Sequence, residues 1–269
     1  MQIIQAIILG LIQGATEFIP VSSSGHLVLV PWLLGWPSPG LVFDTVVHWG
    51  TLVAVLAYFW RDWLALIGAW VRGLVRWDWR DPLARLMWLL LLGSIPAAVI
   101  GFLLEDFFES LFGEPVWVSV FLLITAGLLA VSERLGKRRR EVEDLRWADA
   151  LIIGLGQAAA IAPGISRSGA TMATGLFRGL KRPDAARFSF LLATPIIFGA
   201  GLFKLLDLFS TPDPLAQIPA LVAGFLTAAI VGYLCIWGLL RYLQRGNLYP
   251  FAIYCALLGV FCLVVALLR

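Results

Sequence analysis

The chain is poor in charged residues. Asp, Glu, Lys and Arg make up 14% of its 269 residues, whereas soluble chains carry about 25%. Hydrophobic residues make up 60% of the chain, and the mean hydropathy is +0.89. This composition excludes an ordinary soluble domain and gives no reason to expect a nucleic-acid partner. It is typical of a helical membrane protein with several spans.

Cysteine and histidine are also scarce. Cys235, Cys255 and Cys262 lie in apolar runs late in the chain without the spacing of metal ligands, so we expect buried, unreactive thiols. The two histidines are His26 and His48. The N-terminus lacks the basic segment of a signal peptide, and no small-residue cleavage site follows its first apolar run, so we expect no processing.

Long apolar runs dominate the sequence instead. A helix needs about 20 apolar residues to cross the hydrocarbon core of a bilayer. Six runs are long enough, at residues 42–60, 86–104, 116–133, 187–206, 217–240 and 249–268. Regions 2–35 and 148–177 are also apolar, but Gly, Pro and Ser interrupt them midway. Broken backbone at membrane depth survives where protein buries it or water reaches it, so each of these two regions predicts a re-entrant helix pair.

The two interrupted regions contain related segments. Residues 10–26 read Gly-Leu-Ile-Gln-Gly-Ala-Thr-Glu-Phe-Ile-Pro-Val-Ser-Ser-Ser-Gly-His, and residues 154–169 read Gly-Leu-Gly-Gln-Ala-Ala-Ala-Ile-Ala-Pro-Gly-Ile-Ser-Arg-Ser-Gly. A shift of about 144 positions superimposes them without a gap. It pairs Gly10 with Gly154, Leu11 with Leu155, Gln13 with Gln157, Ser22 with Ser166, Ser24 with Ser168 and Gly25 with Gly169. Interrupted segments in corresponding positions of two halves indicate a binding site near the membrane midplane.

The basic residues predict the orientation. Loops 61–85, 134–147, 178–187 and 241–248 hold 17 of the 20 Lys and Arg residues, whereas loop 105–115 holds four acidic residues and no basic one. With six spans and two re-entrant pairs, all four basic loops fall on one side, which the positive-inside rule makes cytoplasmic.

The resulting fold prediction is an all-α polytopic membrane protein, a single membrane domain over residues 1–269. Six transmembrane helices and two re-entrant helix pairs form an inverted-topology repeat with halves 1–133 and 146–269, whose re-entrant tips meet. Loop 61–85 is predicted to form an amphipathic helix in the plane of the cytoplasmic interface. Its arginines are interspersed with Trp63, Trp70, Trp77 and Trp79.

Glu17 and Arg167 are charges inside these membrane-length apolar regions. A charge at the bilayer centre costs roughly 2.5–3.5 kcal/mol, so both residues are candidates for a functional site. Arg167 provides a permanent, fork-shaped donor that matches phosphate. His26 can transfer protons or attack phosphorus. Glu17 can act as a base, orient His26 or hold a divalent cation, and a structural role of either charge is the alternative.

Small polar residues surround these charges and suit the binding of an oxyanion through hydroxyls and backbone amides. The predicted substrate-binding residues are Ser22, Ser24, Gly25, Ser166, Ser168, Gly169 and Thr171. Ser/Gly-rich membrane segments also form helix-packing surfaces, which is the alternative for each segment taken alone.

Two polar pairs outside this set are less decisive. Gln13 and Gln157 are expected to bond the re-entrant backbone. Asp44 and His48 are four residues apart and share a helix face. They either extend the site or form a satisfied polar pair.

Residues 16–26, Thr-Glu-Phe-Ile-Pro-Val-Ser-Ser-Ser-Gly-His, and residues 163–171, Pro-Gly-Ile-Ser-Arg-Ser-Gly-Ala-Thr, closely resemble the bacterial undecaprenyl pyrophosphate phosphatases linked to bacitracin resistance. The similarity covers the whole chain, including Arg-Phe-Ser-Phe-Leu-Leu-Ala at 187–193. It implies a multi-pass enzyme of the bacterial plasma (inner) membrane that removes the terminal phosphate of undecaprenyl diphosphate. The product is the lipid carrier for peptidoglycan precursors.

The resemblance also implies an active site of Glu17, Ser23, His26 and Arg167 with a divalent cation, Mg²⁺ or Ca²⁺. Some members of the family have Glu where this chain has Gln13, so metal binding here would use Glu17 with the weaker amide oxygen of Gln13. A second class of lipid phosphatases has a catalytic His after its Ser-Arg segment. His48 precedes Arg167, so that assignment fails.

The mechanistic hypothesis is phosphoanhydride hydrolysis in a cleft that opens to the outer face. The nucleophile is Ser23, His26 or a water activated by a Glu17–His26 pair. A secondary transporter or lipid flippase is the alternative, because inverted repeats with broken helices are transporter architecture; a structural scaffold leaves the two charges unexplained. The expected partners are a polyprenyl diphosphate lipid and the bilayer, and a homodimer stays open.

Overall fold

The computed structural model describes residues 1–76, 81–204 and 214–269. Within these residues all regular elements are helices and there is no β-strand. An isolated β-bridge joins Arg140 and Leu180. The first half contains α1 (Ile3–Phe18), α2 (Ser23–Leu34), α3 (Gly40–Tyr58), α4 (Trp60–Arg76), α5 (Pro82–Leu103), α6 (Glu105–Phe112) and α7 (Pro115–Leu135). After the short 3-10 helix η1 (Val142–Asp144) follow α8 (Trp147–Ala159), α9 (Arg167–Phe177), α10 (Arg182–Lys204), α11 (Pro214–Tyr242) and α12 (Tyr249–Leu268).

Six of these helices are long and apolar enough to cross a membrane, and they are α3, α5, α7, α10, α11 and α12. They coincide with the six predicted spans, so the prediction of an all-α polytopic membrane protein is confirmed. The last two residues of the predicted span 187–206 lie outside the described residues.

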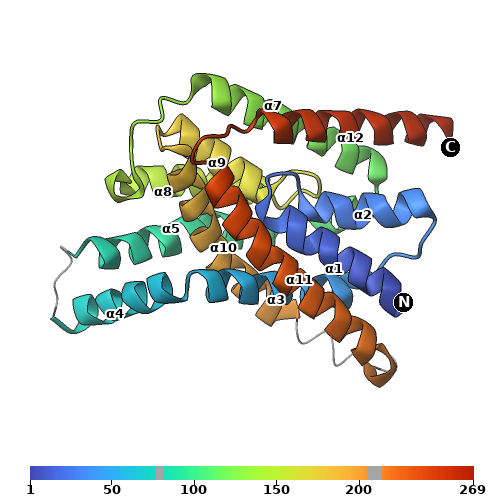
Figure 1. The fold of residues 1–269 in the computed structure, drawn as a ribbon, viewed down its shortest axis with the longest axis horizontal. Coiled ribbons are helices and arrows are strands. Elements are labelled where there is room, and N and C mark those ends of the chain that lie inside the picture. The colour runs from blue at the N-terminus through green and yellow to red at the C-terminus, as the bar shows by residue number, and fades with distance from the viewer. Residues whose placement is uncertain (77–80, 205–213) are drawn as a thin grey trace.

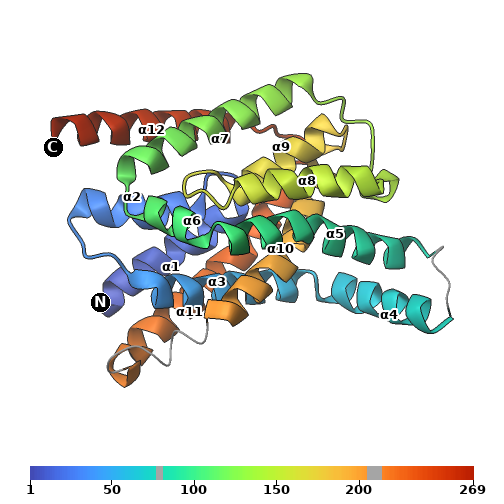
Figure 2. The ribbon, with the colours of Figure 1, turned by 180° about the vertical axis from the view of Figure 1, so that it is seen from behind.

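Helix α4 is amphipathic, as predicted, but its direction differs from the prediction. Its buried residues Trp63, Leu66, Ala69 and Gly73 follow helical spacing. The helix runs beside α5, in line with the spans rather than across them (Figures 1 and 2). The ring centroids of Trp70 and Trp88 lie 5.7 Å apart in an edge-to-face contact, so part of the apolar surface of α4 packs on α5, whereas Leu64 and Val75 are exposed. Trp77 and Trp79 lie outside the described residues.

The four basic loops lie together at one end of the bundle, which we call the basic end. Arg85 donates to the carbonyl of Leu145 at 2.6 Å, and Arg140 donates to the carbonyl of Arg178 at 2.8 Å. The amide of Leu248 donates to Glu133 at 3.0 Å. These bonds join loops 61–85, 134–147, 178–187 and 241–248, as the count of basic residues predicted. Both chain termini lie toward the opposite end (Figure 1).

Asp149 anchors the start of α8 at this basic end. Its carboxylate accepts from Arg140 at 2.7 Å, from the amide of Arg146 at 2.9 Å and from Arg178 at 2.6 Å. Burial raises the pKa of Asp149, but the hydrogen bonds from Arg140, Arg146 and Arg178 outweigh it and hold the pKa at about 2. The carboxylate is therefore ionised at neutral pH and ties α8 to α9.

Two helical hairpins fill the centre of the bundle. Helices α1 and α2 are joined through residues 19–22, and α8 and α9 through residues 160–166, where the sequence predicted the breaks. The two connecting loops face each other (Figures 1 and 2), and the Ser168 hydroxyl lies 3.4 Å from the carbonyl oxygen of Ile19. That the hairpins are re-entrant and inverted stays a prediction.

Glycines let each hairpin approach a span of the other half closely. A Cβ at Gly10 of α1 would lie 2.5 Å from the carbonyl oxygen of Gly224 in α11, and a Cβ at Gly154 of α8 would overlap the carbonyl of Gly93 in α5. Small residues at such crossings allow backbones to pack directly. Because Gly10 and Gly154 are paired positions of the repeat, the two hairpins make the same kind of contact with exchanged partners.

Candidate active site

Glu17 lies in the last turn of α1, and its side chain is buried, with 4% of its surface exposed. Its Oε1 accepts from Arg167 Nη2 at 2.8 Å, and its Oε2 accepts from Ser23 Oγ at 2.6 Å and from Gln13 Nε2 at 2.9 Å. The structure thus brings together Glu17 and Arg167, which are 150 residues apart in the chain. We call Gln13, Glu17, Ser23, His48 and Arg167 the Glu17 cluster.

Two helix N-termini converge on this cluster. Ser23 is the first residue of α2, and Arg167 is the first residue of α9. Ser22 and Ser166 cap these helices, with their hydroxyls accepting from the amides of Gly25 at 3.2 Å and Gly169 at 3.0 Å. Helix N-termini favour negative charge through their unpaired amides and their dipole. The arrangement therefore suits an anion held between the two helices.

The loops before these helices adopt unusual backbone conformations. Ser22 has φ 73°, which costs a residue with a side chain about 1–3 kcal/mol. Gly164 has φ 104°, and a Cβ there would overlap the carbonyl of Val118 on α7. Thr125 of α7 fixes the second loop, because its hydroxyl donates to the Gly164 carbonyl at 3.0 Å and accepts from the Ser166 amide at 3.1 Å. Thr125 was not predicted, since a lone threonine in an apolar span carries no distinguishing signal.

His48 belongs to the cluster through its approach to Glu17. Its Nε2 lies 3.6 Å from Glu17 Oε2, and its Nδ1 bonds the backbone carbonyl of Asp44 at 2.7 Å. A carbonyl only accepts, so Nδ1 carries a proton and Nε2 faces the carboxylate. Within the described residues, the buried Oδ1 of Asp44 has no hydrogen-bond partner. The two side chains therefore do not satisfy each other, and a part of Asp44 in the site stays a prediction.

His26 is held separately from Glu17. The ring is buried, its Nδ1 bonds the Ser22 carbonyl at 2.7 Å, and its Nε2 bonds the hydroxyl of Tyr254 at 2.7 Å. The two rings are stacked, with centroids 5.7 Å apart. Ser22 and Tyr254 therefore orient His26, whereas the sequence had suggested Glu17 for this role. Tyr254 of α12 was missed, because nothing in its apolar span shows which face is inward.

The remaining predicted substrate-binding hydroxyls bond other hydroxyls of the protein. Ser24 lies 3.4 Å from Ser22, and Ser168 lies 3.2 Å from Ser166, measured between Oγ atoms. Thr171 Oγ1 lies 2.6 Å from Ser189 Oγ of α10. Gly25 and Gly169 pack closely against the neighbouring loop residues Gly164 and Ser166. Contact of these residues with a ligand stays a prediction.

The implied divalent cation was tested against the oxygen atoms that the cluster offers. Gln13 Oε1 is buried and has no partner within the described residues, and it lies one helical turn from Glu17. Across residues 1–76, 81–204 and 214–269 no group of three or more His, Cys, Asp or Glu residues could hold a metal ion. One carboxylate and an amide oxygen, completed by substrate phosphates, fit the way in which Mg²⁺ is usually held.

The glutamine prediction is only partly correct. Gln157 Nε2 donates to the Gly93 carbonyl at 3.5 Å, so it bonds backbone as expected, although through a long contact. Gln13 Nε2 bonds the Glu17 carboxylate instead. The difference arises because the paired position after Gln157 is the apolar Ile161, whereas Glu17 follows Gln13 by one turn.

The chain is similar over nearly its whole length to known proteins. The family described as "Bacitracin resistance protein BacA" matches residues 6–261. A protein named "Undecaprenyl-diphosphatase" from Desulforudis audaxviator (strain MP104C) is 50% identical over 265 residues, which cover 98% of each chain. A protein of the same name from Moorella thermoacetica (strain ATCC 39073 / JCM 9320) is 46% identical over the full length of both chains. Another, from Thermomicrobium roseum (strain ATCC 27502 / DSM 5159 / P-2), is 45% identical over 98% of each chain.

Proposed function

The chain belongs to the family of the bacitracin resistance protein BacA, and from this premise we propose that it is an undecaprenyl-diphosphatase. It hydrolyses undecaprenyl diphosphate to undecaprenyl phosphate and phosphate. The product carries peptidoglycan precursors, so the enzyme serves cell-wall synthesis and bacitracin resistance. The names of its relatives support this activity over a secondary transporter or a lipid flippase.

The observation that carries this function is the contact of Glu17 with both Arg167 and Ser23 at two helix N-termini. Arg167 and the first-turn amides of α2 and α9 bind the diphosphate and stabilise the charge that develops on the transferred phosphoryl group. The substrate competes with Glu17 for the guanidinium. When the diphosphate takes Arg167, the carboxylate of Glu17 becomes available as a base.

Ser23 is the nucleophile that the geometry favours. Its hydroxyl donates to Glu17 at 2.6 Å, and Glu17 is in turn held by Gln13, which is the arrangement of an activated nucleophile with an oriented base. Ser23 Oγ attacks the terminal phosphorus, its proton passes to Glu17, and undecaprenyl phosphate leaves with the bridging oxygen. A water then attacks the phosphoserine, which releases phosphate and restores the Ser23 hydroxyl.

The other two polar residues have supporting roles. His26 accepts from Tyr254 through Nε2, so its lone pair is less available for attack on phosphorus than the Ser23 oxygen. His48 lies beside Glu17, with its Nε2 facing that carboxylate at 3.6 Å. Glu17 and Gln13 would hold a Mg²⁺ or Ca²⁺ ion, which neutralises diphosphate charge when bound.

The enzyme lies in the bacterial plasma membrane with its basic end in the cytoplasm. The grouping of the basic loops at one end supports this orientation. The exchanged glycine contacts of Gly10 and Gly154 support two re-entrant pairs in an inverted repeat. In this arrangement the Glu17 cluster opens to the outer face.

The function is tested with detergent-purified protein, a prenyl diphosphate and Mg²⁺, by measuring free phosphate. Arg167→Lys keeps the charge but loses the fork, so we expect kcat to fall by about 10²–10³. Arg245→Lys makes the same exchange on an exposed residue of the basic end and is the matched control. Absence of phosphate release by the unmodified chain would instead support a transporter.

A further inference from the structure

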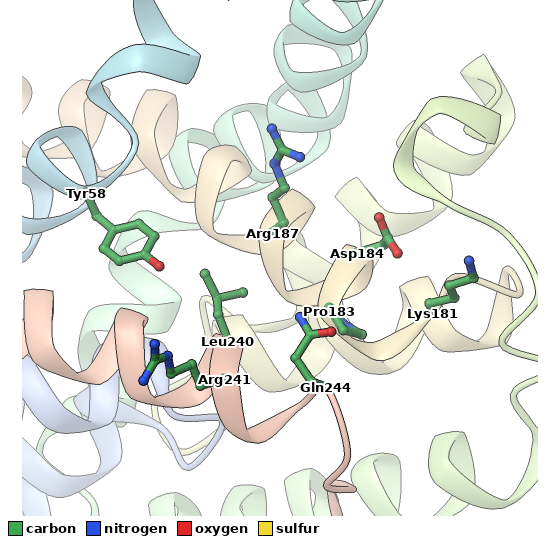
Figure 3. Close-up of a pocket in the computed structure, with 8 residues that line it drawn as sticks. All are labelled: Tyr58, Lys181, Pro183, Asp184, Arg187, Leu240, Arg241 and Gln244. Atoms are coloured by element: carbon green, nitrogen blue, oxygen red, sulfur yellow. The ribbon is translucent and has the colours of Figure 1, made fainter.

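A second polar site lies at the basic end of the molecule, outside the Glu17 cluster. It is a pocket of about 560 Å³ between the end of α3, the start of α10 and the end of α11 (Figure 3). The lining residues are Tyr58, Lys181, Pro183, Asp184, Arg187, Leu240, Arg241 and Gln244. None of them belongs to the Glu17 cluster, so the proposed phosphatase mechanism does not use this pocket.

The lining favours an anion. It contains three cations, Lys181 and Arg187 at the start of α10 and Arg241 near the end of α11, together with one carboxylate, Asp184. The Tyr58 hydroxyl and the Gln244 amide add neutral donors around the same hollow (Figure 3). Guanidinium, ammonium, hydroxyl and amide donors together are the groups that recognise phosphate.

The existing partners of these cations leave room for a ligand. Lys181 pairs with Glu141 at 2.5 Å and Arg187 with Asp62 at 2.5 Å, but the cationic side chains are 45% and 40% exposed. Exposed pairs of this kind contribute little, about 0–1 kcal/mol. Arg241 lies over the ring of Trp237 at 4.7 Å and has no carboxylate partner within the described residues. An arriving phosphate therefore meets one cation without an acidic partner and two that are weakly held.

The apolar side of the pocket points to a lipid as the source of the phosphate. Leu240 lines the pocket, and Tyr58 contacts Tyr233 of α11 edge-to-face at 5.4 Å. Tyr233 and Trp237 are 42% and 47% exposed, and they lie about two turns and one turn before Arg241 on a membrane-spanning helix. An acyl or prenyl chain can follow this aromatic face while its head group enters the pocket. Free phosphate would gain nothing from such a surface.

We propose that this pocket binds the phosphate group of an anionic membrane lipid at the basic end of the protein. A phospholipid such as phosphatidylglycerol and a prenyl monophosphate share the required chemistry. Basic pockets between membrane helices on the cytoplasmic side bind anionic head groups in this way. The site is thus distinct from the Glu17 cluster in position and in the chemistry that it performs.

The test uses the full-length purified protein in detergent and the double variant Lys181→Gln, Arg241→Gln. Its matched control is Lys137→Gln, Arg245→Gln, which removes one Lys and one Arg from exposed positions of the same end outside the pocket. Separate titrations use phosphatidylglycerol, a prenyl monophosphate and inorganic phosphate. The titration with prenyl monophosphate uses proteins that also carry Arg167→Ala, so that the Glu17 cluster does not contribute to the measured binding. We expect the affinity for a lipid phosphate to fall about fivefold per removed cation.

The three titrations distinguish the possible sources of the phosphate group. Selective loss of phosphatidylglycerol binding assigns the pocket to a phospholipid, and selective loss of prenyl monophosphate binding assigns it to the prenyl lipid. Equal loss of inorganic phosphate binding, an equal effect of the control variant, or no effect at all overturns the proposal. Arg241→Lys keeps the charge and should retain most of the affinity. An unchanged rate of phosphate release by the double variant shows that it is folded.

Discussion

Ser23 and Arg167 occupy paired positions of the internal repeat, and each is the first residue of its helix. Both side chains contact the same carboxylate, that of Glu17, Ser23 at Oε2 and Arg167 at Oε1. The repeat therefore supplies two similar backbone frames, and the side chain on each frame decides its chemical role. The proposed nucleophile is the hydroxyl at one position, and the proposed phosphate anchor is the guanidinium at the other.

Ser23→Ala tests the nucleophile directly. Because the variant cannot form a phosphoserine, we expect kcat to fall at least about a thousandfold. Acid quenching with a substrate labelled on its terminal phosphate should trap label on the unmodified protein and none on the variant. Ser24→Ala, which removes the neighbouring hydroxyl, serves as the control. A Ser23→Ala enzyme that keeps a tenth of the rate would point to a water activated by Glu17.

Tyr254→Phe tests the role of the hydrogen bond to His26 while keeping the stacked ring. A neutral hydrogen bond contributes about 0.5–1.5 kcal/mol, so we expect kcat to fall roughly 2- to 12-fold. Since the bond fixes the proton acceptor Nε2, the pH profile of kcat should also shift. Tyr249→Phe on the same helix is the control, because His26 bonds the hydroxyl of Tyr254 and Tyr249 is the first residue of α12. An unchanged pH profile in Tyr254→Phe would show that the bond has no part in the reaction.

At the scale of helices, glycines rather than large apolar residues set the distance between the hairpins and the spans. Ala at Gly10 or Gly154 would push α1 from α11 or α8 from α5, and overpacking of this kind costs about 1–3 kcal/mol. We expect each variant to lower the melting temperature in detergent. Gly127→Ala in α7 is the control, because nothing lies within 4 Å of the added Cβ and helix propensity improves. Equal melting temperatures for all three variants would contradict direct backbone packing at the two crossings.

The sequence was sufficient to predict the transmembrane spans and the helix breaks, but it predicted less well which residues on different helices contact each other. Length and apolarity are sufficient to place the six spans, and the repeat was sufficient to predict that Glu17 and Arg167 meet. Thr125 and Tyr254 were missed because their spans are apolar on all sides, so the sequence does not reveal which of their residues contact the hairpins. The orientation of α4 was wrong for a related reason. An amphipathic pattern reports one apolar face, but it does not tell whether a neighbouring helix or the membrane surface contacts that face.

For the whole molecule, the depth of the site follows from α10. Arg167 Nη1 contacts the carbonyl of Ser189 at 3.4 Å. At 1.5 Å per residue, Ser189 lies about 10 Å from Arg182 at the basic end and about 22 Å from Lys204 at the other. The Glu17 cluster is thus closer to the basic end than to the opposite end of α10 at Lys204. A lipid diphosphate that enters from the outer face must therefore reach deeply into the bundle.

This depth makes the proposed outward opening a demanding prediction, which cysteine labelling can test. In a background without Cys235, Cys255 and Cys262, Ser110→Cys on the acidic α6 should react with a membrane-impermeant maleimide in intact cells. Glu143→Cys at the basic end should react only after permeabilisation, since the positive-inside rule makes that end cytoplasmic. The half-buried Ser24 beside the cluster decides the opening. If Ser24→Cys reacts in intact cells, substrate reaches the cluster from outside. Reaction only after permeabilisation would reverse the opening, and the short path of about 10 Å along α10 would then be the route to the site.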